Sequence, residues 1–392
     1  MNTRVMRRRL VIHTPTIGFN FHTYLKREIE ALHEEHDVIV SCVAELTDGW
    51  TCPCPVLSAA RIHSSALAPP KWDRVTTNYT MLPQAAKDRF AQMLVDGTIE
   101  RYVADHRTEG VFVQWLDDTL PLVDLAERLR LPYIVRCHGT DIAAGIMQDS
   151  TRRLYAAYGR VRAVLAGSQY ARSLLPRCGI PESVGKVAPF ALEPPSRFAS
   201  PGSNPDRVNV LTVGRIELVK GSIFSLVGFK IAADQDPRLF LNVVGAGTLL
   251  PAYRQLVDAL DLGQKVKLWG LLPNEGAELA ELWQTSDIFL QSSVVVPTES
   301  SIETFCVGAL EAMAAGLAMI VSDSQALPEL VAGGACGTIV PAGNSAAIGM
   351  AVLELARAPE RLAAFGAMAR KRVTDHYTKA NQCDAVLSAL FA

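Results

Sequence analysis

Two carboxylates in the second half of the chain flank an expected helix start. Glu303 and Glu311 stand on either side of Val307, where a helix of small residues is predicted to begin. A helix N-terminus offers unpaired backbone N–H groups and a partial positive charge to an anion. Carboxylates accept paired hydrogen bonds from hydroxyl groups. The stretch is therefore suited to a diphosphate that carries hydroxyl-rich groups.

Two cations, Arg215 and Lys220, follow the expected strand 208–213 across a turn. An arginine offers a rigid fork of donors and a lysine a mobile point charge, and together they can neutralise a diphosphate. By themselves, an arginine and a lysine at a helix start are more often solvated surface residues. A second glycine turn, 244–247, is followed by Leu250 where a dinucleotide-binding GxGxxG motif ends in glycine, which argues against a dinucleotide site.

In the first half, His138 follows the expected strand 132–136, at the strand end where parallel α/β sheets carry ligands. It is either a site residue or an ordinary loop histidine. Asp141 fits a helix cap as well as a ligand contact. Trp115, at the end of the expected strand 110–115, fits either the site of a second substrate or a surface turn.

These residues all follow apolar runs of strand length, which alternate with helical segments. The expected strands are 10–13, 37–43, 110–115, 132–136, 163–166, 186–188, 208–213, 239–244, 266–269, 288–291 and 318–322. The stretch 46–82 is expected to be loop and short helix, and 85–106 a single helix. The alternation predicts an α/β fold with two Rossmann-like halves.

The stretch 193–207 is dense in Pro, Ser and Gly and has no apolar period, which is typical of a linker. We therefore expect a first domain over 1–195, a linker over 196–207 and a second domain over 208–372. The tail 373–392 is expected to be helical, and its apolar residues need a surface to cover.

Bulk composition narrows the choice of partners and compartment. A net charge of −2 gives no reason to expect nucleic acid as a partner. No apolar segment reaches the length of a membrane span, and the apolar run after the basic start is too short for a signal peptide, so membrane association would be at most peripheral. The eight cysteines are scattered and are read as reduced, which favours the cytoplasm. No metal-binding cluster stands out in the sequence.

Four stretches of the second half resemble the retaining glycosyltransferases of family 4, the group 1 glycosyl transferases. They are VGRIELVKG (213–221), VVGAGTL (243–249), KLWGLLPNEGAELAELWQTSDIFLQSS (267–293) and ETFCVGALEAMAAGLAMIVSDSQALPELV (303–331), the last being similar to the family's E-x7-E signature. The first half matches more loosely, through HGTD (138–141) and GSQYARSLL (167–175). The resemblance implies a GT-B fold, in which two Rossmann-like domains face each other across a cleft and the C-terminal helix packs back on the N-terminal domain.

The activity that the resemblance implies is transfer of a sugar from a UDP- or GDP-linked donor to an acceptor hydroxyl, with retention of anomeric configuration. The first domain would bind the acceptor and the second the nucleotide-sugar. Family members generally need no metal ion or other cofactor. The acceptor, which fits a small specialised metabolite, a glycolipid or a polysaccharide, and the oligomeric state stay open.

The resemblance also implies roles for individual residues. Arg215 and Lys220 would neutralise the departing diphosphate, while Glu303 and Glu311 would hold hydroxyls of the transferred sugar and of the ribose. His138 would contact the donor sugar, so the catalytic set is Glu303, His138, Arg215 and Lys220. The other donor-binding residues would be Gly18, Gly245, Phe305, Cys306 and Val307, and the acceptor-binding residues Trp115 and Asp141.

Three stretches depart from the family pattern, and one of them is the first loop, which has a single glycine, Gly18, where many members have two adjacent ones. Gln325 and Ala326 stand where many members have two glycines before Pro-Glu, and 190–192 replaces the usual Asn-Gly-Val. Both changes fall in regions that affect the hinge or the shape of the pocket, so an unusual donor preference is expected. Two other readings stay open: a nucleotide-sugar epimerase of the same architecture, and a catalytically silent partner subunit.

Overall fold

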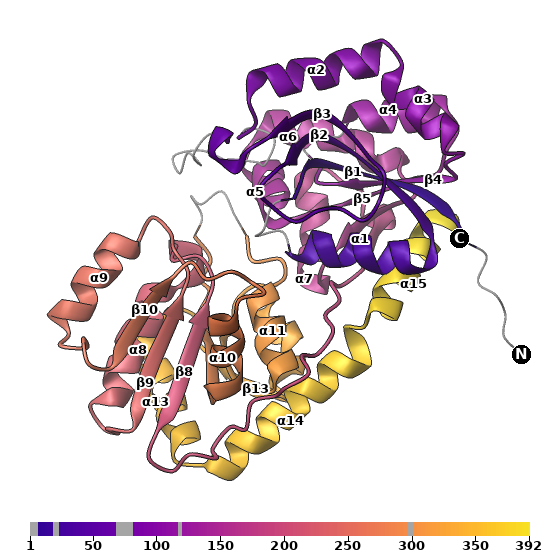
Figure 1. The fold of residues 1–392 in the computed structure, drawn as a ribbon. Coiled ribbons are helices and arrows are strands. Elements are labelled where there is room, and N and C mark those ends of the chain that lie inside the picture. The colour runs from indigo at the N-terminus through magenta and orange to yellow at the C-terminus, as the bar shows by residue number, and fades with distance from the viewer. Residues whose placement is uncertain (1–6, 19–22, 68–80, 117–119, 297–301) are drawn as a thin grey trace, which may run out of the picture. The chain divides into compact units, whose positions relative to one another are not determined.

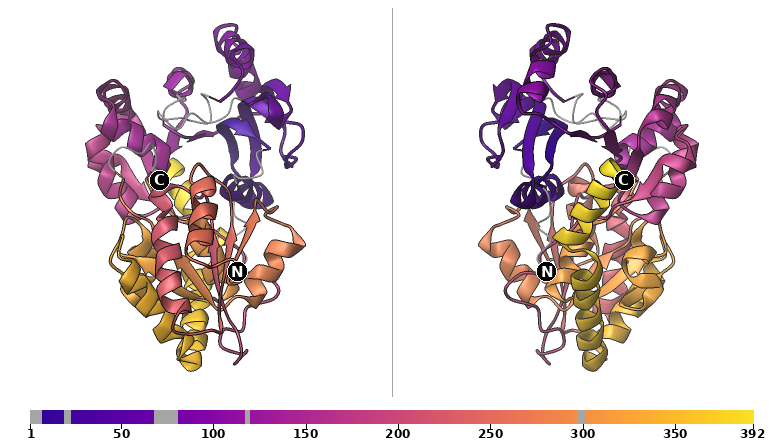
Figure 2. Two further views of the ribbon diagram at one scale, coloured as in Figure 1. Left: turned by 90° about the vertical axis from the view of Figure 1, so that its left-hand side faces the viewer. Right: turned by 90° about the vertical axis from the view of Figure 1, so that its right-hand side faces the viewer.

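The computed structural model describes residues 7–18, 23–67, 81–116, 120–296 and 302–392. The chain divides into two compact units, one formed by Met1–Ala191 together with Lys379–Ala392 and the other by Leu192–Thr378. The described part of each unit contains one parallel β-sheet with helices packed on both of its faces (Figures 1 and 2). The predicted α/β class with two Rossmann-like domains is confirmed.

The sheet of the first unit has the strand order β3-β2-β1-β4-β5-β6-β7. Its strands are β1 (Arg9–Ile17), β2 (Asp37–Leu46), β3 (Val56–Ile62), β4 (Gly110–Gln114), β5 (Tyr133–Arg136), β6 (Ala163–Ala166) and β7 (Gly185–Val187). Its α-helices are α1 (Thr23–Glu35), α2 (Gln84–Val95), α3 (Thr98–Asp105), α4 (Leu120–Arg128), α5 (Gly139–Met147), α6 (Asp149–Tyr155), α7 (Gln169–Leu174) and α15 (Lys379–Phe391).

The sheet of the second unit has the strand order β10-β9-β8-β11-β12-β13. Its strands are β8 (Val208–Val213), β9 (Leu239–Val244), β10 (Val266–Gly270), β11 (Ile288–Gln291), β12 (Ala318–Ser322) and β13 (Gly337–Val340). Its α-helices are α8 (Ser222–Ala233), α9 (Leu250–Ala259), α10 (Ala277–Thr285), α11 (Val307–Ala315), α12 (Leu327–Leu330), α13 (Ser345–Ala356) and α14 (Pro359–His376). In both sheets the chain order reverses direction next to the first strand of the unit, and ligands of such sheets bind at the carboxyl ends of the strands there.

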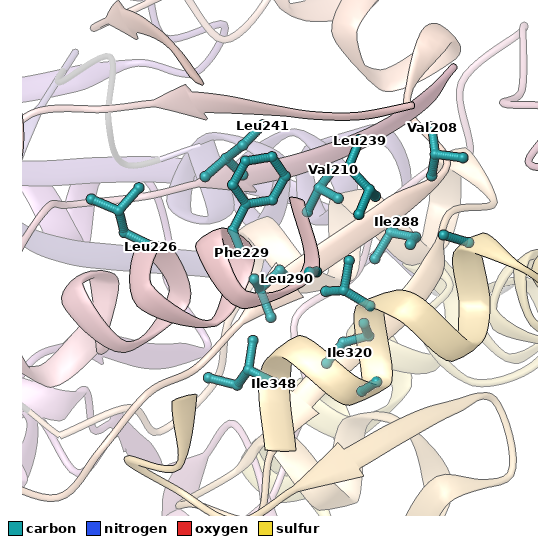
Figure 3. Packing of buried hydrophobic residues seen from close by; sticks show 14 of the residues in the cluster. Val208, Val210, Leu226, Phe229, Leu239, Leu241, Ile288, Leu290, Ile320 and Ile348 are labelled. Atoms are coloured by element: carbon teal, nitrogen blue, oxygen red, sulfur yellow. The ribbon is translucent and has the colours of Figure 1, made fainter. Parts of the chain in front are cut away.

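The core of the second unit lies between its sheet and the helices α8, α9 and α13 (Figure 3). Phe229 of α8 and Ile348 of α13 are fully buried in it, together with Leu241 and Ile320 from the strands. Each such side chain contributes about 1.5–3 kcal/mol through the removal of apolar surface from water. The strand ends of this sheet are thereby held on a rigid support.

The helix expected over 373–392 is two helices in the structure. α14 ends at His376 in the second unit, and α15 begins at Lys379 and belongs to the first unit. α15 buries Val386 and Leu390 in the core that α1 forms with the first sheet. The apolar face of the tail is thus covered.

The stretch 196–207, which was predicted to be a linker, lies along the second unit. The N–H of Ala199 donates to the carbonyl oxygen of Ala315 at 2.9 Å. The N–H of Gly202 donates to the buried carboxylate of Asp287 at 2.8 Å. These bonds explain why the boundary between the units falls before this stretch, at Ala191 and Leu192.

Two expectations for the first unit are wrong. The stretch 46–82 contains the strand β3, which was missed because it is an edge strand with mostly half-buried side chains and no apolar alternation. The helix expected over 85–106 is divided into α2 and α3 at Gly97, whose φ of +76° is incompatible with a continuous helix. Residues 68–80 lie outside the described part of the chain.

α14 is the longest of the described helices, with 18 residues. Its sequence carries four cations, Arg361, Arg370, Lys371 and Arg372. Among the described residues, no helix combines the length and the apolar character needed to cross a membrane.

Candidate functional site

The second unit brings the predicted glycine turns and cations together at the carboxyl ends of β8 and β9. A Cβ at Gly245 would lie 1.9 Å from the carbonyl oxygen of Gly214, so only glycine fits where the two turns touch. Arg215 follows at an exposed position, and Lys220 ends a short 3₁₀ helix, Leu218–Lys220. The two cations therefore lie on the same edge of the sheet.

Lys220 donates a short hydrogen bond to the carboxylate of Glu303. The side chains are only 18% and 8% exposed, so the pair is largely shielded from water. Burial lowers the pKa of Lys220, but attraction to the Glu303 carboxylate more than offsets this effect, and the net pKa is raised. The ammonium group is therefore charged throughout the neutral pH range.

Glu303 is supported by polar groups from β11 and β12. The hydroxyl of Ser293 donates to the Glu303 carboxylate at 3.4 Å, and the side-chain amide of Gln291 donates to the same hydroxyl at 2.8 Å. The hydroxyl of Ser322 donates to the carbonyl oxygen of Ser293 at 2.6 Å. The carboxylate is thus held by the sheet rather than by a loop alone.

The helix α11 begins beside the end of β8. A Cβ at Gly308 would lie 2.9 Å from the carbonyl oxygen of Val213, which shows how closely the first turn of α11 approaches that strand. No side-chain oxygen caps the helix at Cys306. Glu311 lies one turn after Val307 on the same helix and is half-buried. The first turn of α11, with the partial positive charge of a helix N-terminus, therefore lies next to the strand end that leads to the two cations.

The residues before α11 are buried and serve as its support. Phe305 is 9% exposed and meets the ring of Tyr377 edge-on at 5.9 Å. Burial, and then the nearby Glu303 carboxylate, raise the pKa of Cys306 to about 12. The thiol is therefore protonated at neutral pH and is no nucleophile.

In the first unit His138 lies between β5 and α5, as predicted. Its ring stacks on Trp115, with centroids 4.4 Å apart, and is 9% exposed. Its Nε2 lies 3.3 Å from the side-chain oxygen of Gln114. Because the Gln114 amide nitrogen donates to Glu28, the oxygen faces His138, and a hydrogen bond there requires the proton on Nε2.

Asp141 acts as a cap at the start of α5. Its carboxylate accepts the N–H of His138 at 2.9 Å and the N–H of Leu116 at 3.1 Å, and the side chain is fully buried. The capping interpretation of Asp141 is therefore confirmed. Trp115 is only 3% exposed, and its positive φ of 68° turns the chain away at the end of β4. Asp141, through its hydrogen bond, and Trp115, through its stacked ring, therefore both keep His138 in position.

Gly18 follows β1 and has a φ of +91°. A Cβ there would lie 2.9 Å from the carbonyl oxygen of Leu46, and the carbonyl oxygen of Gly18 accepts the N–H of Trp50 at 3.1 Å. The glycine is thus required by the packing of this unit itself. The residues that follow it, 19–22, lie outside the described part of the chain.

A buried polar network behind His138 was not predicted. Glu28 and Arg136 form an ion pair at 2.5 Å with side chains 1% and 0% exposed. Glu28 also accepts hydrogen bonds from Gln114 and from Gln382 of α15, each at 2.8 Å. Arg136 donates to the carbonyl oxygen of Ala188 at 2.7 Å. The only sequence signal for the network was an arginine at the end of an apolar strand.

The described residues contain no group of three or more His, Cys, Asp or Glu side chains that could hold a metal ion. The predicted site residues form two sets, one in each unit. The set of the second unit is Arg215, Lys220, Gly245, Glu303, Phe305, Cys306, Val307 and Glu311, and that of the first unit is Gly18, Trp115, His138 and Asp141.

Residues 195–372, which carry the whole set of the second unit, match the model of the family described as glycosyl transferases group 1. This part of the chain, the group 1 domain, is therefore similar to the group 1 glycosyl transferases. The group 1 domain includes the Lys220–Glu303 pair and the start of α11.

Relatives that resemble the chain are themselves described as glycosyltransferases. The amylovoran biosynthesis glycosyltransferase AmsK of Erwinia amylovora is 24% identical over 244 residues, a match that spans 62% of this chain and 59% of AmsK. The GDP-mannose-dependent alpha-(1-6)-phosphatidylinositol monomannoside mannosyltransferase of Mycolicibacterium smegmatis is 23% identical over 338 residues, 81% of this chain and 87% of that enzyme. These matches extend the similarity beyond the group 1 domain.

The fold of the whole chain is shared with solved structures. The Anabaena protein HepE, solved in complex with UDP and glucose, aligns with a TM-score of 0.71 over 98% of this chain and 99% of HepE, at 14% identity. The shared architecture is the GT-B fold, with two Rossmann-like domains in one chain.

Proposed function

We propose that the protein is a retaining glycosyltransferase that moves a sugar from a nucleoside-diphosphate donor to an acceptor hydroxyl without a metal ion. The observation that carries this proposal is the shielded Lys220–Glu303 pair beside the start of α11, within the group 1 domain. A cation and a helix N-terminus, which suit a pyrophosphate, lie here beside a carboxylate, which suits the hydroxyl groups of the attached sugar.

In this proposal Lys220, Arg215 and the N–H groups of α11 bind the diphosphate and stabilise it as it leaves. Negative charge grows on the β-phosphate as the glycosidic bond breaks, and fixed positive charge in a shielded site stabilises that charge most strongly. Glu303 accepts hydroxyls of the transferred sugar, and Glu311 those of the ribose. When the donor binds, its phosphates replace Glu303 as the partner of Lys220 and release the carboxylate for the sugar.

The first unit is proposed to bind the acceptor and to contribute His138 to the reaction. The His138 side chain accepts the backbone N–H of Asp141 in the capping box of α5, and its Nε2 faces Gln114, so the ring is held in one pose for contact with the donor sugar. Trp115 and Asp141 were predicted to bind the acceptor, and their burial supports an indirect part in it, through the pose of His138. We also propose a cytoplasmic location, which the eight free cysteines support.

We expect UDP or GDP to raise the melting temperature of the protein. A ligand at 100 times its Kd stabilises the native state by about 2.7 kcal/mol, which corresponds to roughly 5–10 °C for a domain of this size. Differential scanning fluorimetry with UDP, GDP and ADP measures the shift, and UMP serves as the control that lacks the β-phosphate. Both bases are included because one relative is named GDP-mannose-dependent and HepE was solved with UDP. If none of the three diphosphates shifts the melting temperature, the proposal is wrong.

The base that binds then selects the nucleotide-sugars for a turnover assay with and without acceptors. Release of nucleoside diphosphate that requires an acceptor supports transfer. Interconversion of the sugar without an acceptor would instead indicate an epimerase, and binding without turnover a silent partner subunit. Retention is tested by the anomeric proton couplings of the product, and metal independence by unchanged turnover in excess EDTA.

A further inference from the structure

Gln325 occupies a position where the backbone strongly favours glycine. It lies in the turn between β12 and α12 with a φ of +58°. Left-handed backbone is uncommon for residues other than glycine, asparagine and aspartate, so a glutamine there carries strain. Strain of this kind persists where the side chain makes compensating interactions.

The side-chain amide of Gln325 makes two hydrogen bonds to the connection between β11 and α11. Its oxygen accepts the backbone N–H of Glu303 at 2.5 Å. Its nitrogen donates to the carbonyl oxygen of Val294 at 2.8 Å. One side chain therefore ties together the beginning and the end of this connection. Residues 297–301 within it lie outside the described part of the chain.

These bonds fix the backbone of Glu303 on both sides of its Cα. Gln325 holds the N–H of Glu303, and the N–H of Ala326 donates to the Glu303 carbonyl oxygen at 3.3 Å. The carboxylate of Glu303 then meets Lys220 and Ser293. A carboxylate that must receive sugar hydroxyls depends on such a fixed backbone, because a displacement of about 1 Å can cost on the order of 100-fold in rate.

We propose that Gln325 is a positioning residue for Glu303, which it holds in place for the transferred sugar by linking the two ends of the β11–α11 connection. The proposal deepens the transferase function stated above and rests on it. The two hydrogen bonds of the Gln325 side chain go to Glu303 and Val294, so it acts on the sugar end of the donor and should leave diphosphate binding unaffected.

The test replaces Gln325 by glycine. We expect kcat for transfer to fall on the order of 10- to 100-fold, while the Kd for the matching nucleoside diphosphate changes less than about twofold. The melting temperature should change little, because relief of the left-handed backbone offsets the loss of the two side-chain hydrogen bonds. A residue that only stabilised the fold would show the reverse, with a lower melting temperature and a kcat close to that of the wild type.

Ala332 provides a matched control, because it is exposed and has a φ of +52° without a side chain that can form hydrogen bonds. Ala332→Gly should relieve comparable strain and leave kcat unchanged. Gln325→Glu keeps the acceptor for the Glu303 N–H but loses the donor to Val294 and adds a negative charge beside Glu303. It should therefore lose activity as well.

A second readout needs no turnover. In the ligand-free protein, Gln325→Gly should speed hydrogen exchange at the Glu303 amide at least about tenfold, since that N–H loses its acceptor, whereas Ala332→Gly should leave it unchanged. Unchanged exchange, or wild-type kcat in Gln325→Gly, overturns the positioning role alone. A wild-type protein that binds no nucleoside diphosphate overturns the transferase function and this inference with it.

Discussion

Lys220→Ala is expected to lower kcat/KM for sugar transfer about 10³-fold, near the upper end of what the loss of one preorganised electrostatic group costs. Lys220 is the largely shielded cation next to the start of α11, and its pKa is raised, so it supplies a full positive charge where the departing diphosphate gathers negative charge. Arg215 is exposed, and water weakens what it can contribute instead. Release of nucleoside diphosphate in the presence of acceptor measures the loss.

Removal of Lys220 also leaves Glu303 without its cation, so a loss of stability must be separated from a loss of catalysis. Lys220→Ala with Glu303→Ala removes both members of the pair and should recover stability relative to Lys220→Ala without recovering activity. Lys230→Ala is the matched control. It also breaks a lysine–carboxylate pair, the one between Lys230 and Asp234 at the C-terminal end of α8, and neither residue is among the predicted site residues. It should change neither property by much. Transfer close to the wild-type rate in folded Lys220→Ala would contradict the assignment.

The pKa of Lys220 also sets an expectation for pH. A raised pKa means that the ion pair contributes its full stability below the ordinary lysine value of 10.5 and loses it only as the pH rises through the higher folded value. Between pH 6 and 9 the pair should therefore add nothing to the pH dependence of stability. A bell-shaped rate profile in that range would therefore report on a group other than Lys220.

The strands that carry the site could be predicted closely from the sequence. The predicted bounds of β8, β9, β11 and β12 agree with the structure, because each is a mostly apolar, buried or half-buried run of strand length that is followed by glycine or polar residues. Apolar runs of this length are too short to be predicted as helices. The predicted positions of Lys220, in the turn that follows β8, and of Glu303, at the end of the loop before α11, depended on these strands.

The polar contacts behind the site could not be predicted, because they join residues far apart in the sequence. Gln325 was recognised as a departure from the family pattern, but its bonds to Val294 and Glu303 depend on the left-handed turn in which it lies. The pair Glu28–Arg136 joins residues 108 positions apart. A glutamate among the apolar residues of a helix gives no indication of which strand supplies its partner.

That pair gives the largest stability effect that we expect in the first unit. Glu28→Ala should lower the free energy of unfolding of this unit by about 3–5 kcal/mol, because Arg136 would stay buried with its charge uncompensated. The amides of Gln114 and Gln382 would lose their acceptor at the same time. Hydrogen exchange resolved by mass spectrometry measures the change at β4 and β5, and the strands of the second unit provide the internal control.

Glu28→Leu combined with Arg136→Met distinguishes the contribution of this pair to stability from its contribution to the orientation of His138. Replacing a buried ion pair by apolar side chains of similar volume often restores stability, so the double variant should recover much of what Glu28→Ala loses. It should not recover transfer, because Gln114 would still lack the carboxylate that turns its oxygen toward His138. A double variant as active as the wild type would mean that His138 is oriented by Trp115 and the start of α5 alone. A double variant that is stable but slow would show that the buried pair serves the histidine.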